Sequence, residues 1–188
     1  GLRWVKSAAD DPLVPRRGYR ISVETRGAAE AALSETSFLR GAVISSGVLP
    51  MPFDARLLGR ARLGAVWVDD FGALPPDERF FTGGDQTVRG YRFNTLGPRN
   101  ADGRVIGGTY LGVASLEYEQ PVYGRFALAA FVDAGNAFGG PGEDPGLAKS
   151  AGIGLRMRSL VGSIRLDFAH PFDSDDLVMF HLRLGPDL

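Results

Sequence analysis

The chain has 188 residues, enough for one domain with a sizeable core. Its 21 basic and 22 acidic residues nearly balance, and no basic cluster with interleaved aromatic residues occurs, so the sequence does not indicate a nucleic-acid partner. The absence of cysteine excludes a disulfide framework and a thiolate metal site. No apolar run reaches the roughly 18–20 residues of a membrane-spanning helix, but a transmembrane strand needs only about 9–11 residues.

The first third of the chain predicts four strands. Residues 1–7 alternate weakly and end at a turn rich in aspartate and proline, whereas residues 18–27 alternate cleanly between apolar and charged side chains. Two more strands are expected at 37–48 and 57–68, separated by a proline-containing turn. The alanine-rich stretch 28–34 is expected to be a loop.

A long loop at about 69–107 follows these strands, and the remaining elements are arranged around it. Its central part, Arg79–Pro98, has no helical spacing, but it carries several large aromatic side chains that argue against disorder. These are Phe80, Phe81, Tyr91 and Phe93. Arg89 lies at its centre, next to Gly90, and we expect the loop to be a packed plug whose arginine meets an anionic partner. The second half, 97–108, is polar and is expected to be exposed.

Five strands with regular alternation come after the loop. Each has an uninterrupted apolar face and a face that bears charge, and the expected ranges are 109–120, 126–138, 152–158, 163–169 and 177–185. The period of two places Glu117 and Asp133 on the charged faces of the first two of these strands.

Alternation alone also fits a soluble β-sandwich. Two features favour an antiparallel transmembrane β-barrel instead. Tight turns at 121–124 and 160–162 alternate with long loops, as periplasmic turns alternate with extracellular loops, and Tyr and Phe gather near strand ends as in an aromatic girdle. Nine strands are an odd number, whereas single-chain bacterial barrels have an even number, so either the count is wrong or the chain is part of a larger barrel.

Three motifs resemble one family. They are GGDQTVRGY at 83–91, FVDAGNAF at 131–138 and the closing GPDL at 185–188. Together they resemble the bacterial surface antigen family, the barrel half of the outer-membrane protein assembly and translocation superfamily. The end of the chain and PLVPRRGYR at 12–20 look most similar to the barrel subunit of the translocation and assembly module.

The resemblance implies a barrel of sixteen strands, with the arginine loop between the eleventh and the twelfth. Residues 1–188 would then be the C-terminal part of an outer-membrane β-barrel domain, holding its last nine strands. The first seven strands and the periplasmic repeat domains of the family would lie outside this sequence. The expected location is the bacterial outer membrane.

The resemblance also implies which residues carry the function. The loop would fold into the lumen, where Arg89, Gly90 and Tyr91 would form a lock with Asp133 and Glu117. A lateral seam between the last and the first strand would place Phe180, Leu182, Leu184 and Gly185 at the opening.

On this resemblance the expected function is non-enzymatic: the barrel assists assembly, insertion or translocation of outer-membrane proteins and autotransporters. Its expected partners are the outer-membrane lipid bilayer, client proteins and, through N-terminal domains, an inner-membrane or periplasm-spanning protein. Two alternatives remain open, a membrane anchor for a secreted patatin-type lipid hydrolase and a translocation pore like those of two-partner secretion. No cofactor is expected. His170 and His181 lack a third ligand at a sensible spacing for a metal, and the sequence shows no catalytic constellation.

Overall fold

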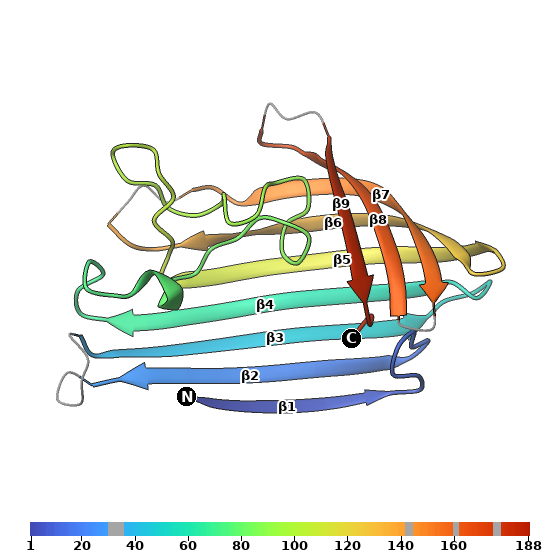
Figure 1. Cartoon of the computed structure of the whole chain (residues 1–188), viewed down its shortest axis with the longest axis horizontal. Helices are drawn as coiled ribbons and strands as arrows, with labels where there is room; N and C mark the ends of the chain where they lie inside the picture. The colour runs from blue at the N-terminus through green and yellow to red at the C-terminus, as the bar shows by residue number, and fades with distance from the viewer. Residues whose placement is uncertain (30–35, 142–144, 160–161, 175–177) are drawn as a thin grey trace.

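The computed structural model describes residues 1–29, 36–141, 145–159, 162–174 and 178–188. Within these residues the chain forms one nine-stranded antiparallel sheet, in which each strand pairs with the next along the chain (Figure 1). The strands are β1 (Leu2–Ala9), β2 (Gly18–Ala28), β3 (Phe38–Pro50), β4 (Arg56–Val68), β5 (Tyr110–Tyr123), β6 (Phe126–Phe138), β7 (Ala148–Ser159), β8 (Gly162–Pro171) and β9 (Met179–Gly185). Among these residues the predicted all-β class, with nine antiparallel strands, is confirmed.

Most strands are longer than their patterns predicted, and β7 differs most. β7 begins four residues before the expected start, because Ala148 pairs with Gly135 and Ser150 pairs with Asp133. Small side chains carry little alternation, so only pairing with β6 identifies this stretch as strand. β5 runs through the expected turn as far as Tyr123. Three predicted features lie largely outside the described residues: the turn at 160–162 apart from Gly162, which begins β8, the loop at 28–34 apart from its first two residues, and the start of the last strand at 177.

The two faces of the sheet differ as the alternation predicted. On β6, Leu128 and Val132 are exposed on one face, whereas Phe131 and Asp133 are buried on the other. The exposed face, called the outer face below, carries apolar side chains along the whole sheet. The opposite, inner face carries the charged residues, and this arrangement fits a wall with an apolar outside and a polar lumen.

The sheet is strongly curled, so that its two ends approach each other across the inner face. β7, β8 and β9 turn away from the plane of the earlier strands in Figure 1. The residues after β9 lie beside the start of β4, where an Asp187 oxygen is 2.8 Å from an Arg56 nitrogen. No helix among the described residues is long and apolar enough to cross a membrane.

The connection between β4 and β5 packs against the inner face. It contains the short 3-10 helix η2 (Pro76–Glu78) and is otherwise irregular. Leu74 and Phe80 of this loop form a core cluster with Ala42 of β3 and Val66 of β4. The plug is therefore held by apolar contacts as well as by charge.

Two expectations about this loop were wrong. Phe93 is 76% exposed, so it does not help to pack the plug. The second half of the loop is not exposed throughout, because Gly97, Pro98, Gly107 and Gly108 are buried and exposure is confined to its middle. Antiparallel bridges from Phe80 to Gly108 and from Thr82 to Leu96 hold the two halves of the loop together. Because these bridges join residues far apart in the chain, the composition of the loop did not predict which parts of it are buried.

Candidate functional site

The centre of the loop is buried against the inner face. Val88 is completely buried, and together with Tyr91 it packs against Val113 of β5 and Ala148 of β7. The Tyr91 hydroxyl donates a hydrogen bond to the Lys149 carbonyl oxygen at 3.1 Å. These contacts fix the chain on both sides of Arg89.

Gly90 is required by its backbone conformation and by its surroundings. Its φ is +93°, which disfavours any residue with a Cβ, and an added Cβ would lie 3.1 Å from the Pro171 nitrogen. Its N–H donates to Nε2 of His181 at 3.2 Å, which ties the loop to β9. His181 is thus an inner-face hydrogen-bond acceptor. Among the described residues no group of three or more His, Asp or Glu could hold a metal ion.

Arg89 and Asp133 form a bidentate pair. Nε of Arg89 donates to Oδ2 of Asp133 at 2.7 Å, and Nη2 donates to Oδ1 at 2.8 Å. The backbone N–H of Arg89 donates to the same carboxylate at 3.1 Å. Two parallel bonds to a planar fork fix the orientation of the arginine as well as its charge.

Two further strands supply partners for the same guanidinium. Nη1 of Arg89 donates to Glu117 of β5 at 2.6 Å and to Asp167 of β8 at 3.3 Å. Its Cζ lies 3.4 Å from the ring centroid of Phe131, so the cation also stacks on an aromatic face. Arg89 therefore joins the loop to three strands, β5, β6 and β8.

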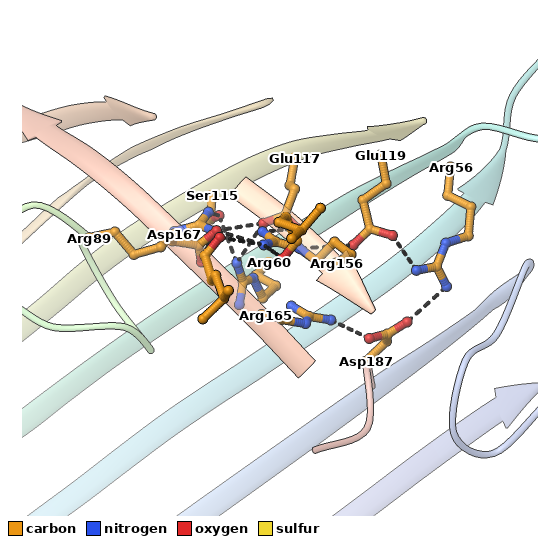
Figure 2. A network of polar contacts seen from close by, with 12 residues as sticks. Arg56, Arg60, Arg89, Ser115, Glu117, Glu119, Arg156, Arg165, Asp167 and Asp187 are labelled. Atoms are coloured by element: carbon orange, nitrogen blue, oxygen red, sulfur yellow. Dashed lines mark hydrogen bonds and ion pairs between the residues drawn. The ribbon is translucent and has the colours of Figure 1, made fainter. Parts of the chain in front are cut away.

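Arg156 of β7 forms a second centre next to the first. Its guanidinium lies 2.7 Å from Glu117 and 2.7 Å from Asp167, the two carboxylates that it shares with Arg89 (Figure 2). Asp167 therefore lies between two cations, and Glu117 also contacts a third, Arg60 of β4, at 3.4 Å. Sharing of this kind compensates for the cost of removing several charges from water.

A third group of ion pairs ties the end of the chain to the wall. Asp187, which follows β9, pairs with Arg165 of β8 and with Arg56 of β4, and Arg56 also pairs with Glu119 (Figure 2). The Asp187 N–H donates to the Leu13 carbonyl oxygen at 3.3 Å. The segment after β9 is thereby held inside the curl of the sheet.

The pKa values follow these contacts. Burial disfavours the charged form of Arg89, but the hydrogen bonds and charge of Asp133, with Glu117 and Asp167, outweigh it and raise its pKa above the ordinary value. Burial would raise the pKa of Asp187, but the charges of Arg165 and Arg56 outweigh it and lower that pKa. Both groups therefore stay ionised at neutral pH, and their ion pairs hold the loop and the end of the chain against the strands.

The structure brings the predicted lock residues together, with Arg89 in contact with Asp133 and Glu117. Sequence reasoning missed Asp167, Arg156 and the stacking of Phe131 in this cluster. The alternation did place these three side chains on the inner face, but it did not indicate which side chains they contact. Asp187 carried no periodic signal at all, because it lies beyond the last strand.

The four predicted seam residues lie apart from this cluster. Phe180, Leu182 and Leu184 are exposed on the outer face of β9, and Gly185 pairs with Ser163 at the end of that strand. Among the described residues β9 pairs only with β8. Its other edge therefore presents backbone groups that no strand among the described residues satisfies.

Comparison with known proteins places this architecture in a family. The profile of the Omp85 superfamily domain matches residues 1–185. The chain belongs to the Omp85 superfamily. It is a segment of an outer-membrane β-barrel, located in the bacterial outer membrane.

Two curated relatives and one solved structure illustrate the family. Outer membrane protein assembly factor BamA of Nitratidesulfovibrio vulgaris is 37% identical over 179 residues, a match that covers 92% of this chain and 22% of BamA. Outer envelope protein 80 of Arabidopsis thaliana chloroplasts is 32% identical over 124 residues, a match that covers 61% of this chain and 15% of that protein. The crystal structure of BamA from Haemophilus ducreyi lacking POTRA domains 1–3 shares the fold, with a TM-score of 0.76 and 20% identity, over 95% of this chain and 40% of that one.

The chain thus spans only 15–22% of the curated relatives that it matches. Among the described residues the sheet ends at two strands, β1 and β9, that each pair on one side only, and the chain covers 40% of the compared BamA chain.

Proposed function

We propose that this chain is the C-terminal part of a barrel that assists the assembly and insertion of outer-membrane proteins, and that it acts without enzymatic chemistry. The observation that carries the proposal is the attachment of one buried loop arginine to carboxylates of β5, β6 and β8. The similarity to BamA, an outer membrane protein assembly factor, supports it. In the proposed whole, these nine strands are the last of sixteen.

In this proposal the five residues Arg89, Gly90, Tyr91, Asp133 and Glu117 act as a lock that sets the position of the loop. The loop contacts β9 through the Gly90–His181 hydrogen bond, and the strands that hold Arg89 lead directly to β9. A change in the loop is therefore transmitted to the edge strand through paired strands and not through an exposed linker.

The edge of β9 is the proposed seam. An unpaired strand edge in a sheet templates an incoming strand, and main-chain hydrogen bonds provide affinity without requiring one sequence. Phe180, Leu182 and Leu184 supply an apolar outer face on which the strand of a client protein can continue the membrane wall. Gly185 ends the strand, and the proline that follows it cannot donate to a ladder.

The experiment that tests this function uses the full-length protein in proteoliposomes and follows the folding rate of an unfolded outer-membrane client. Arg89→Ala should slow client folding while the barrel itself still inserts, because the lock and not the wall is lost. Arg92→Ala is the matched control, since this exposed arginine lies three residues away in the same loop. Equal rates for the Arg89 variant and the wild type would contradict the proposal.

A finer proposal is that the barrel acts in the translocation and assembly module, with autotransporters as clients and a periplasm-spanning partner. Only the similarity of residues 12–20 and of the last strands supports it, whereas the relatives reported above are BamA and an envelope protein. Secretion of an autotransporter passenger in cells that carry Arg89→Ala separates the two roles. A loss of passenger at the surface with normal porin levels would support the finer assignment.

A further inference from the structure

The outer face carries a hollow that the assembly function does not use. It has a volume of about 970 Å³, near the upper end of the roughly 300–1,000 Å³ typical of small-molecule sites. Its surface is mostly apolar, and it extends from the turn between β1 and β2 to the middle of β4 and β5. Its principal side chains are Tyr19, Ile21, Leu49, Leu57, Ala61 and Leu116.

The hollow exists because its floor lacks side chains. Gly47 of β3 lies directly opposite Gly59 of β4 in the register, and Tyr19 and Leu116 flank this pair on β2 and β5. A Cβ added at Gly59 would meet nothing within 4 Å, and one added at Gly47 would meet only a backbone oxygen at 3.7 Å. The space above both glycines is therefore open to the outside.

The hollow is a local feature of the outer face. On β6 the residue that pairs with Leu116 is the exposed Val132, and Leu128 and Ile153 are further exposed large side chains on the outer face of β6 and β7. Because the outer face of an outer-membrane barrel borders hydrocarbon, this hollow must be filled by apolar chains of the bilayer.

The end of the hollow at the β1–β2 turn carries a free cation. Arg17 lines it and is exposed, and among the described residues no ion pair or side-chain hydrogen bond involves its guanidinium. The nearby Asp10 carboxylate accepts backbone hydrogen bonds from Arg16 and Arg17 at 2.9 and 3.1 Å, so it is engaged within the turn. Short connections such as this turn lie on the periplasmic side of such barrels.

We infer that the hollow is a binding site for an anionic phospholipid of the periplasmic leaflet. One acyl chain lies over Gly47 and Gly59 between Tyr19 and Leu116, and the phosphate pairs with Arg17. The direction fits a lipid, since the charged end of the site is at the rim of the membrane and the apolar end points toward the middle of the strands. The inference rests on the outer-membrane location alone and is independent of the assembly function.

The test measures lipid retained by the full-length protein after detergent extraction, by native mass spectrometry. Gly47→Leu and Gly59→Leu fill the hollow and should abolish the tightly held phospholipid. Gly41→Leu is the matched control, because Gly41 is on the same strand and face as Gly47, has nothing within 4 Å of an added Cβ and lies outside the hollow. Lipid loss in the control equal to that in Gly47→Leu, or no loss in either, would overturn the site.

A second measurement tests the charge. Added phosphatidylglycerol should compete better than phosphatidylethanolamine, and Arg17→Gln should reduce this preference by about fivefold, the effect of one basic residue at a lipid surface. An unchanged preference would overturn the role of Arg17. A photoreactive residue at Leu49 in native membranes distinguishes the occupants, because lipid adducts support the inference and a discrete protein adduct overturns it.

Discussion

At Arg89 both the shape and the charge of the side chain are in use, since the guanidinium makes two parallel bonds to Asp133 and stacks on Phe131. Lysine keeps the charge but offers neither the planar fork nor the flat stacking surface. The pair is buried on both sides, so removing one partner leaves the other charge poorly compensated.

We therefore expect Arg89→Ala and Asp133→Ala each to cost about 3 kcal/mol of unfolding free energy, and the double variant to cost clearly less than their sum. Arg89→Lys should recover only a minor part of the loss. Urea titration of the refolded barrel in detergent measures all four proteins. Strict additivity of the two single changes would show that the pair is not energetically coupled.

The ion pairs of Asp187 predict how the stability of the fold changes with pH. Its folded-state pKa lies below the ordinary value of 3.8, because Arg165 and Arg56 favour the carboxylate. Its stabilising contribution is therefore complete at neutral pH and is lost as the pH falls through the folded-state value.

The difference in stability between the wild type and Asp187→Asn should accordingly be largest at pH 7 and should shrink below about pH 4. Proteolytic release of the last residues at each pH reports the attachment of this segment. A difference that grew toward acid pH would contradict the ion pairs described here.

At the scale of the element, each strand has one face for lipid and one for the lumen, and depth in the membrane sets the cost of a charge. Val132 lies at the middle of β6, whereas Tyr123 lies at the turn between β5 and β6. Both are exposed on the outer face, at 54% and 83%.

Val132→Arg should therefore destabilise the barrel by about 2–4 kcal/mol, and Tyr123→Arg by about 1 kcal/mol or less. Refolding titrations into lipid vesicles give both values. The reverse order would be incompatible with a membrane-spanning β6.

The loop depends on a missing side chain in β4. An added Cβ at Gly64 would lie 2.4 Å from the ring of Phe80, so the ring rests directly on the glycine backbone. Gly64→Ala should displace the first half of the loop and make it cleavable near Phe80 by added protease. Gly59→Ala on the same strand, where the space is open, should leave cleavage unchanged.

At the scale of the whole molecule, the two edges of the sheet decide how this segment joins the rest of a barrel. β1 and β9 each pair on one side only among the described residues, and this chain covers 40% of the compared BamA chain. Closure therefore depends on strands outside this sequence, because open edges do not persist in lipid.

Cysteines at Phe180, Leu182 and Leu184 in the full-length protein should form crosslinks to a client or to the first strand of the barrel. Residues 1–188 contain no cysteine, so any native cysteine elsewhere in the full-length protein is first replaced by serine. Cysteines at Leu128 and Ala130, in the middle of the sheet, should give none. Crosslinking of equal yield from the two sets would argue against a special seam.

Local pattern determined the strands and their faces. A period of two is a property of neighbouring residues, so Leu128 and Asp133 could be assigned to opposite faces without knowledge of any partner strand. The pairing of Arg89 with Asp133 and Glu117 was inferred from parity and from resemblance to a family, and the contacts agree with it.

Only the tertiary structure decided which charges meet. Asp167 reaches Arg89, and Asp187 reaches Arg56 from 131 residues away, because register and curl bring separate strands together. The same holds for the glycine-floored hollow, since Gly47 and Gly59 face each other only in the final register. The local sequence determines on which face of the sheet a residue lies. Contacts between side chains of different strands on the inner face depend on distances that the whole sheet sets.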